Sequence, residues 1–131
     1  MIEKRQFYIN GAWVEAQAGT AHDVIDPSTE EACAVISLGG EADTNAAVAA
    51  AKAALPGWMA TPVEDRIAAL ERVYAAYKAR AEDLGPAISV EMGAPIDMAK
   101  TQQVGAGLWH LKNFITAAKA FPWEAPLGDD T

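Results

Sequence analysis

The chain has 131 residues, of which 51% are hydrophobic, and carries a formal net charge of −8 at pH 7. This length suits one domain with a modest core, and the hydrophobic fraction excludes a disordered chain. The acidic balance, without a basic patch, excludes nucleic acid and an anionic membrane surface as expected partners. No apolar run approaches the ~18 residues of a membrane span. With no apolar signal-peptide core and with Cys33 as the single cysteine, we expect a cytoplasmic protein.

Residues 1–39 are typical of strands and turns. Asn10-Gly11 lies between two apolar-aromatic runs, which is the strongest short-range pattern for a β-hairpin with a type I′ turn. Residues 22–25 and 32–36 are two further β-prone runs. The connection between them, Asp26–Glu31, has turn chemistry, because proline fixes φ and short polar side chains bond nearby amides. We therefore expect two β-hairpins.

Residues 40–121 favour about four helices. The first is expected from Asp43 to Leu55, where Pro56-Gly57 should stop it. The second should begin at Thr61 as N-cap, with Pro62 at the first helical position and Glu64 completing a capping box. Its apolar stripe is Ile67, Leu70, Tyr74 and Tyr77, and its charged residues lie largely outside that stripe: Asp65, Arg66, Arg72 and Lys78.

The third and fourth helices are bounded by glycine and proline. The third is expected over residues 82–92, ending at Gly93, with Pro86 tolerable only in the first turn. The fourth should span Pro95 to Phe121 and close at Pro122. Residues 122–131 then form a tail, and the fold class is α+β.

Five segments stand in a characteristic order: the hairpin at 8–13, the turn at 24–31, the helices at 43–58 and 65–80, and Glu91-Met92-Gly93-Ala94-Pro95-Ile96. In this order they resemble the N-terminal portion of the aldehyde dehydrogenase superfamily. Three positions depart from the family pattern, where Asp26 stands for asparagine, Glu30 for glycine and Ala94 for lysine.

The resemblance implies a fragment of the α/β aldehyde dehydrogenase fold, in which an aldehyde is oxidised to a carboxylic acid with NAD or NADP. The family's catalytic cysteine, general base and nucleotide-binding loop lie beyond residue 131. The chain alone should therefore be inactive and bind no cofactor. Expected partners are the remainder of the polypeptide, further copies in a homo-oligomer and a small-molecule aldehyde. A second interpretation is a free-standing, non-catalytic helical interaction module derived from the same superfamily.

The resemblance also implies a monovalent-cation site at Val24, Ile25 and Glu91. In such a site, backbone oxygens come from the strand before the turn and a carboxylate comes from just before the Gly-x-Pro. Independently, the spacing places Glu91 on the helix face of Leu84 and Ile88, where a buried carboxylate must be paired, protonated or bound to a cation. The alternative is that Glu91 reaches the rim of that face or pairs with an arginine.

The fourth helix contains two costly glycines. Gly105 and Gly107 each cost ~1 kcal/mol relative to alanine in a helix interior. Close packing against another element is one cause, and clearance for a ligand is the other. The resemblance implies that this helix lines the aldehyde tunnel, with Gly107, Leu108 and Leu111 as a wide apolar entrance wall. Trp109, about 100° around the helix from Leu108, should point elsewhere.

Other chemistry-bearing residues have simpler explanations. Cys33 lies on a β-prone run without a neighbouring histidine, so we expect a structural thiol. Gly105 and Gly107 lack the third glycine and the preceding strand of a dinucleotide-binding loop. His22 and His110 have no partner at metal-ligand spacing.

Overall fold

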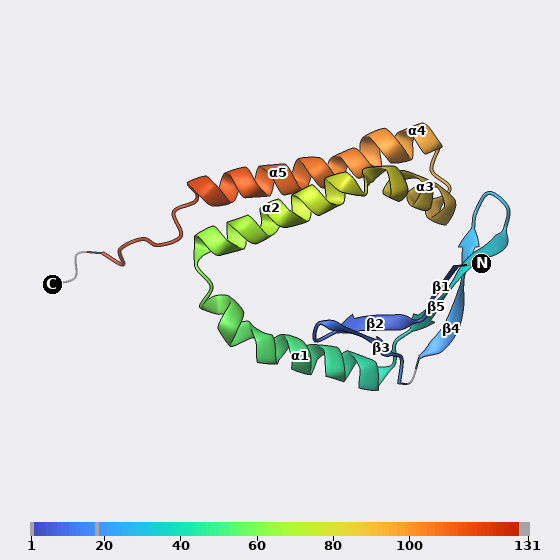
Figure 1. Cartoon of the computed structure of the whole chain (residues 1–131), viewed down its shortest axis with the longest axis horizontal. Helices are drawn as coiled ribbons and strands as arrows, with labels where there is room; N and C mark the ends of the chain where they lie inside the picture. The colour runs from blue at the N-terminus through green and yellow to red at the C-terminus, as the bar shows by residue number, and fades with distance from the viewer. Residues whose placement is uncertain (1, 18, 129–131) are drawn as a thin grey trace.

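The computed structural model describes residues 2–17 and 19–128, and shows the expected α+β organisation of strands followed by helices (Figure 1). The strands are β1 (Ile2–Lys4), β2 (Gln6–Ile9), β3 (Ala12–Glu15), β4 (Thr20–Asp26) and β5 (Glu31–Leu38). The helices are α1 (Glu41–Met59), α2 (Val63–Ala79), α3 (Ala81–Met92), α4 (Ile96–Met98), the π-helical turn η1 (Ala99–Gln103) and α5 (Val104–Ala120). Of the expected tail, residues 129–131 lie outside the described residues.

The first predicted hairpin is confirmed. Strands β2 and β3 pair in antiparallel register, and both turn residues have positive φ, 53° at Asn10 and 78° at Gly11. Tyr8 and Trp13 face each other across the pair with ring centroids 5.2 Å apart, in an edge-on arrangement. Such a cross-strand aromatic pair is the unit that stabilises a small sheet.

The second hairpin, β4–β5, is also confirmed, and its sheet has an additional edge strand. Asp26 Oδ1 accepts a hydrogen bond from the Ser28 amide at 2.8 Å, which is the turn chemistry expected there. Strand β1 pairs in parallel with β5, so the sheet order is β1-β5-β4. The sequence does not indicate β1, because its three exposed residues have no alternating pattern and their partners lie about thirty residues away in the chain.

Asp43 fixes the start of α1 against the strands. Its side chain is 5% exposed; Oδ2 accepts the Gly40 amide at 3.0 Å and Oδ1 accepts the Gln17 amide at 2.8 Å. The carboxylate thus caps α1 and holds the segment between β3 and β4 to the helix N-terminus, where a negative charge is favoured.

Two predicted helix boundaries are wrong. Helix α1 continues through Pro56-Gly57 to Met59 because this turn is exposed, and water can satisfy the carbonyl that the missing proline N–H leaves free. Thr61 does not cap α2, since its hydroxyl donates to the Gly57 carbonyl at 3.1 Å. The N-cap of α2 is Pro62, which makes no side-chain cap hydrogen bond, so there is no capping box with Glu64.

The other boundaries agree better with the sequence. Helix α3 ends at Met92, and Gly93 adopts the left-handed conformation with φ 70°. Pro86 lies beyond the first turn, yet the helix continues through this exposed position. The predicted fourth helix is present from Ile96 to Ala120, but η1 interrupts its α-helical hydrogen bonding. No sequence signal predicted this π-helical turn.

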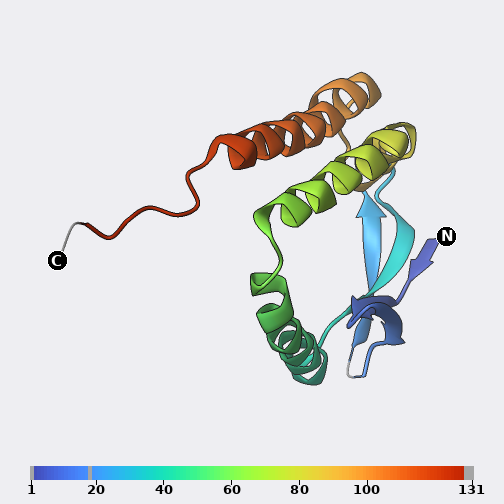
Figure 2. The same ribbon diagram turned by 60° about the vertical axis from the view of Figure 1, so that its left-hand side comes forward.

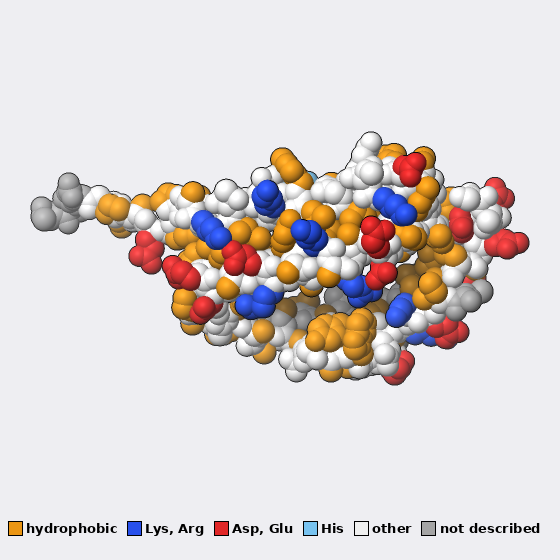
Figure 3. All heavy atoms as spheres, turned by 45° about the horizontal axis from the view of Figure 1, so that its top comes forward, with side chains coloured by type: hydrophobic (Ala, Val, Ile, Leu, Met, Phe, Trp, Pro, Cys, Tyr) orange, Lys and Arg blue, Asp and Glu red, His pale blue; other side chains and the backbone are white. Residues whose placement is uncertain are grey.

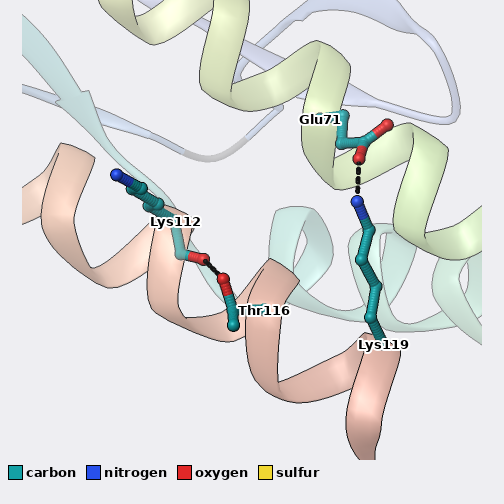
Figure 4. A network of polar contacts seen from close by, with 4 residues as sticks. All are labelled: Glu71, Lys112, Thr116 and Lys119. Carbon is teal, nitrogen blue, oxygen red and sulfur yellow. Dashed lines mark hydrogen bonds and ion pairs between the residues drawn. The ribbon is translucent and has the colours of Figure 1, made fainter.

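Helices α2 and α5 lie side by side and form one layer, whereas α1 diverges from them towards the β2–β3 hairpin (Figures 1 and 2). The predicted α2 stripe is half-buried in this layer. An ion pair joins the two helices, with Lys119 Nζ 2.7 Å from Glu71 Oε1 (Figure 4). Both side chains are about half exposed, so this pair contributes little to stability.

The core is thin. Among the described residues, the buried hydrophobic side chains are Val35, Ala99 and Val104, and no large side chain is fully buried. Hydrophobic side chains instead spread over the visible surface between the charged ones (Figure 3). Exposed apolar area on this scale is typical of a surface that another polypeptide covers. Within the described residues, no helix is both long and apolar enough to cross a membrane.

Candidate functional site

The end of β4 and the end of α3 meet at the Pro27 turn. A Cβ placed on Gly93 would lie 2.7 Å from Pro27 Cγ, so the turn packs directly on the helix terminus. Glycine is required at residue 93 both by this approach and by its positive φ. The fold therefore brings the two segments that carry Val24, Ile25 and Glu91 to one edge of the molecule.

The strand part of this edge is irregular. The register shifts between Val24 and Ile25, because their partners on β5 are Ala34 and Ala32 and Cys33 between them is an extra, bulged residue of β5. The Val24 carbonyl accepts the Cys33 thiol at 3.3 Å, and the Ile25 side chain is 48% exposed. Cys33 is half-buried, so the structure assigns this thiol a hydrogen bond within the sheet.

Glu91 is not on a buried face. Leu84 and Ile88 are half-buried, but Glu91 itself is exposed, so its carboxylate needs no compensating partner in this chain. A face of α3 that is only partly covered leaves room for the carboxylate to reach solvent. In the part of the chain that the structure describes, no cluster of three acidic, histidine or cysteine side chains could hold a metal ion.

Of the predicted entrance residues, Gly107 lies against Tyr77 of α2. A Cβ on Gly107 would meet the Tyr77 hydroxyl and lie 2.7 Å from its Cζ. Leu108 and Leu111 are half-buried. This close approach of α2 supports packing as the reason for glycine at residue 107. A Cβ on Gly105, by contrast, would meet nothing within 4 Å.

Three ring side chains follow on α5: Trp109, His110 and Phe114. Trp109 is 63% exposed, whereas the neighbouring Leu108 is half-buried. The His110 ring lies between Trp109 and Phe114, with ring centroids 4.9 Å and 6.4 Å away, respectively. His110 is thus placed among aromatic rings.

The start of α1 does not form a phosphate site, although it follows a strand and two glycines. The first turn carries Glu41 and Asp43, and the Asp43 carboxylate already accepts the Gly40 amide. Negative side chains at this helix N-terminus oppose a second anion. This local geometry does not suit the diphosphate of a nicotinamide nucleotide.

An apolar groove that the sequence analysis did not predict lies where α1, α2 and α5 meet the C-terminal segment. Its volume is about 360 Å³. We call it the Trp58 groove, and its main lining residues are Trp58, Ile67, Leu70, Val73, Ala118 and Trp123. Only the periodic stripe of α2 indicated one of its walls, because the other walls come from segments far apart in the sequence.

Gln103 is a second feature that sequence reasoning missed. It ends the π-helical turn, and its amide Oε1 is buried without a hydrogen-bond partner. The turn packs closely on α3, where a Cβ on Gly85 would lie 3.3 Å from Lys100 Cα. Gly85, a glycine within a predicted helix, was the sequence feature that could have indicated the close contact between α3 and η1.

Comparison with known proteins assigns the fold. The model of the aldehyde dehydrogenase family matches residues 13–127. A 3-succinoylsemialdehyde-pyridine dehydrogenase of a Pseudomonas species is 36% identical over 129 residues, which are 98% of this chain and 27% of that protein.

Solved structures give the same result. An aldehyde dehydrogenase of Bartonella henselae superposes with a TM-score of 0.95 at 45% identity, covering 100% of this chain and 28% of that one. An aldehyde dehydrogenase of Pseudomonas syringae, solved with NAD+ and octanal, gives 0.91 at 35% identity, covering 95% of this chain and 26% of that one.

The chain thus spans about a quarter of the length of these relatives and corresponds to their N-terminal portion. The family model covers most of the chain, including the hairpin tryptophan, the Pro27 turn and all the helices. The chain belongs to the aldehyde dehydrogenase family.

Proposed function

We propose that this chain is the N-terminal portion of an NAD(P)-dependent aldehyde dehydrogenase that oxidises an aldehyde to a carboxylic acid, and that it is inactive alone. One observation carries the proposal: nearly the whole chain matches relatives that are about four times as long. The reaction needs a nucleophile and a hydride acceptor. NAD or NADP, when bound, supplies the hydride acceptor. Cys33 does not fit as the nucleophile, because its thiol is half-buried and donates to the Val24 carbonyl.

The purified chain should show no aldehyde-dependent formation of NADH or NADPH above a blank without protein. A full-length enzyme, in which residues 1–131 are followed by the remaining part of the family fold, should turn over. Absorbance at the reduced-nicotinamide band, with octanal as one substrate, measures both. Turnover by the chain alone, or its absence from a folded full-length enzyme, would contradict the proposal.

The partners follow from the same proposal. They are the remainder of the polypeptide, further copies of the enzyme in a homo-oligomer, and a small-molecule aldehyde. Relatives bound to NAD+, including one from Mycobacterium tuberculosis, support this nucleotide for the full-length enzyme. The free thiol of Cys33 fits a reducing compartment, and we place the enzyme in the cytoplasm.

For the cation, we propose that the backbone oxygens of Val24 and Ile25 and the Glu91 carboxylate contribute ligands in the full-length enzyme. The packing of the Pro27 turn on Gly93 supports this, because it holds the two segments together. Oxygen ligands suit a hard cation. The remaining ligands would come from beyond this chain, and the Val24 carbonyl would have to exchange or share its bond to the Cys33 thiol.

Replacing Glu91 by glutamine should weaken the dependence of thermal stability on K⁺ or Na⁺ in the full-length enzyme. The substitution removes the charge but keeps the shape of the side chain, so the stabilisation that is lost is the electrostatic attraction between the carboxylate and the cation. The midpoint of unfolding is measured against KCl or NaCl, with choline chloride holding the ionic strength constant. Glu82→Gln, an exposed carboxylate on the first turn of α3, is the control. A salt response equal to that of the wild type would remove Glu91 from the site.

For the substrate entrance, we propose that Leu108 and Leu111 belong to an apolar wall. Their apolar character and half-burial on α5 support a wall that favours bulky aldehydes. In this proposal Gly107 has an indirect role. Because it has no side chain, α5 can lie close to Tyr77, and this packing sets the position of both leucines.

A further inference from the structure

The Trp58 groove combines an apolar lining with one unsatisfied donor. Ile67, Leu70 and Ala118 are half-buried, whereas Trp58 and Trp123 are each 52% exposed on its walls. Apolar side chains arranged around a cavity of this size leave space for further side chains rather than for ordered water. The groove is therefore an uncompleted piece of core.

Arg66 is the polar exception. The sequence places it outside the apolar stripe of α2, yet it is half-buried and lines the groove. Its guanidinium lies over the Trp123 ring at 5.7 Å, which is within the range of a cation–π contact. Its Nε is buried without a hydrogen-bond partner. Because a buried unmade hydrogen bond is costly, the geometry calls for an oxygen acceptor from whatever fills the groove.

The C-terminal segment leads away from the same place. Trp123 forms one wall, and its Nε1 donates to the Ala118 carbonyl at 3.0 Å, which anchors the segment to the end of α5. Beyond it the chain extends outward, with Leu127 fully exposed (Figures 1 and 2). A polypeptide that continues from here starts beside the groove, so the entropy cost of returning to it is small.

We propose that the groove is filled by a segment of the polypeptide that follows this chain in the full-length enzyme. That segment places apolar side chains between Trp58 and Trp123 and gives a backbone or side-chain oxygen to Arg66 Nε. This inference rests on the proposed function, because relatives extend for about three quarters of their length beyond the matched region. A second copy is the competing occupant, and the first test below distinguishes it from the following segment.

The first test compares tryptophan oxidation in the chain and in the full-length enzyme. Hydroxyl-radical footprinting read by mass spectrometry gives a rate for each tryptophan, normalised to the denatured protein. Trp58 and Trp123 should oxidise about tenfold more slowly in the full-length enzyme, because burial removes them from solvent. Equal rates in the two proteins would overturn the inference. So would protection that appears only in the concentrated 131-residue chain, because that result assigns the groove to a second copy.

The second test isolates the Arg66 hydrogen bond. Arg66→Lys keeps the positive charge over Trp123 and removes Nε, whereas Arg72→Lys makes the same change at an exposed residue of α2. In the full-length enzyme, Arg66→Lys should lower the thermal midpoint by about 2 °C or more, and Arg72→Lys should leave it unchanged. Equal midpoints for both variants would overturn the acceptor part of the inference.

The same preparations separate this inference from the proposed function. Aldehyde oxidation without protection of Trp58 and Trp123 rejects the groove inference and leaves the enzyme assignment intact. Protection of both tryptophans without aldehyde oxidation keeps the groove inference and rejects the assigned activity. Since footprinting of the unmodified enzyme gives the first result, a variant that fails to fold does not prevent the test.

Discussion

Replacing Gly107 by valine is expected to disrupt the α2–α5 layer, whereas replacing Gly105 by alanine is expected to stabilise α5. At Gly107 even a Cβ would overlap the Tyr77 side chain. Its aromatic ring is rigid, so it adjusts less readily than a flexible aliphatic side chain would. Overpacking of this kind costs about 1–3 kcal/mol for a single added carbon, and the branched valine should cost more. At Gly105 the space is open, so alanine should gain about 0.5–1 kcal/mol from helix propensity.

The two glycines are matched controls for each other, because they lie two residues apart on one helix. The free energy of unfolding of the full-length enzyme, from urea denaturation, should fall for Gly107→Ala and Gly107→Val and rise for Gly105→Ala. Adding Tyr77→Leu to Gly107→Val should recover part of the loss. A stable Gly107→Val enzyme with reduced kcat/KM only for bulky aldehydes would show instead that Gly107 provides clearance for substrate.

The isolated chain is expected to self-associate or to remain loosely packed. With Val35, Ala99 and Val104 as the buried hydrophobic residues among those described, hydrophobic burial falls short of the entropy cost of ordering the chain. Exposed tryptophans on the hairpin, on α1 and on α5 add to the uncovered surface. Trp13 is 65% exposed and Trp58 is 52% exposed. Light scattering should therefore give a mass above that of the monomer that rises with concentration, and unfolding should be broad.

The full-length enzyme is the control for this experiment, since its remaining part should cover the same faces. It should show a fixed assembly mass and bind little of a dye that reports exposed apolar surface. A compact monomer of residues 1–131 with sharp, cooperative unfolding would contradict the expectation. That outcome would favour the free-standing interaction module.

Local signals gave most of the secondary structure. The Asn10-Gly11 turn needs positive φ at both residues, which few other pairs tolerate, so one short motif was enough to predict the hairpin. Gly93 ended α3 for the same reason. The errors occurred where an exposed environment relaxed a local rule: solvated proline at residue 56 did not stop α1, and Thr61 bonded backwards to Gly57 rather than capping α2.

Long-range contacts were not predictable in this way. Strand β1 forms because its residues pair with the free edge of β5. The identity of these three residues does not indicate that their partners lie about thirty positions away. The Asp43 bond to the Gln17 amide likewise joins segments 26 residues apart. The spacing of Leu84 and Ile88 correctly predicted that these two residues share a face of α3. It did not indicate that other elements cover this face only partly, so that Glu91 is exposed to solvent.

By itself, the sequence determined the order of elements and, through a few ordered motifs, the resemblance to the aldehyde dehydrogenases, because turn and helix-end chemistry depends on adjacent residues. Only the tertiary structure decided why Gly107 is a glycine and how α1, α2 and α5 form an unfilled groove around Arg66. Those features depend on atoms brought together from distant segments. Packing at one residue follows from the shape of its neighbours, and a linear pattern records polarity but not shape.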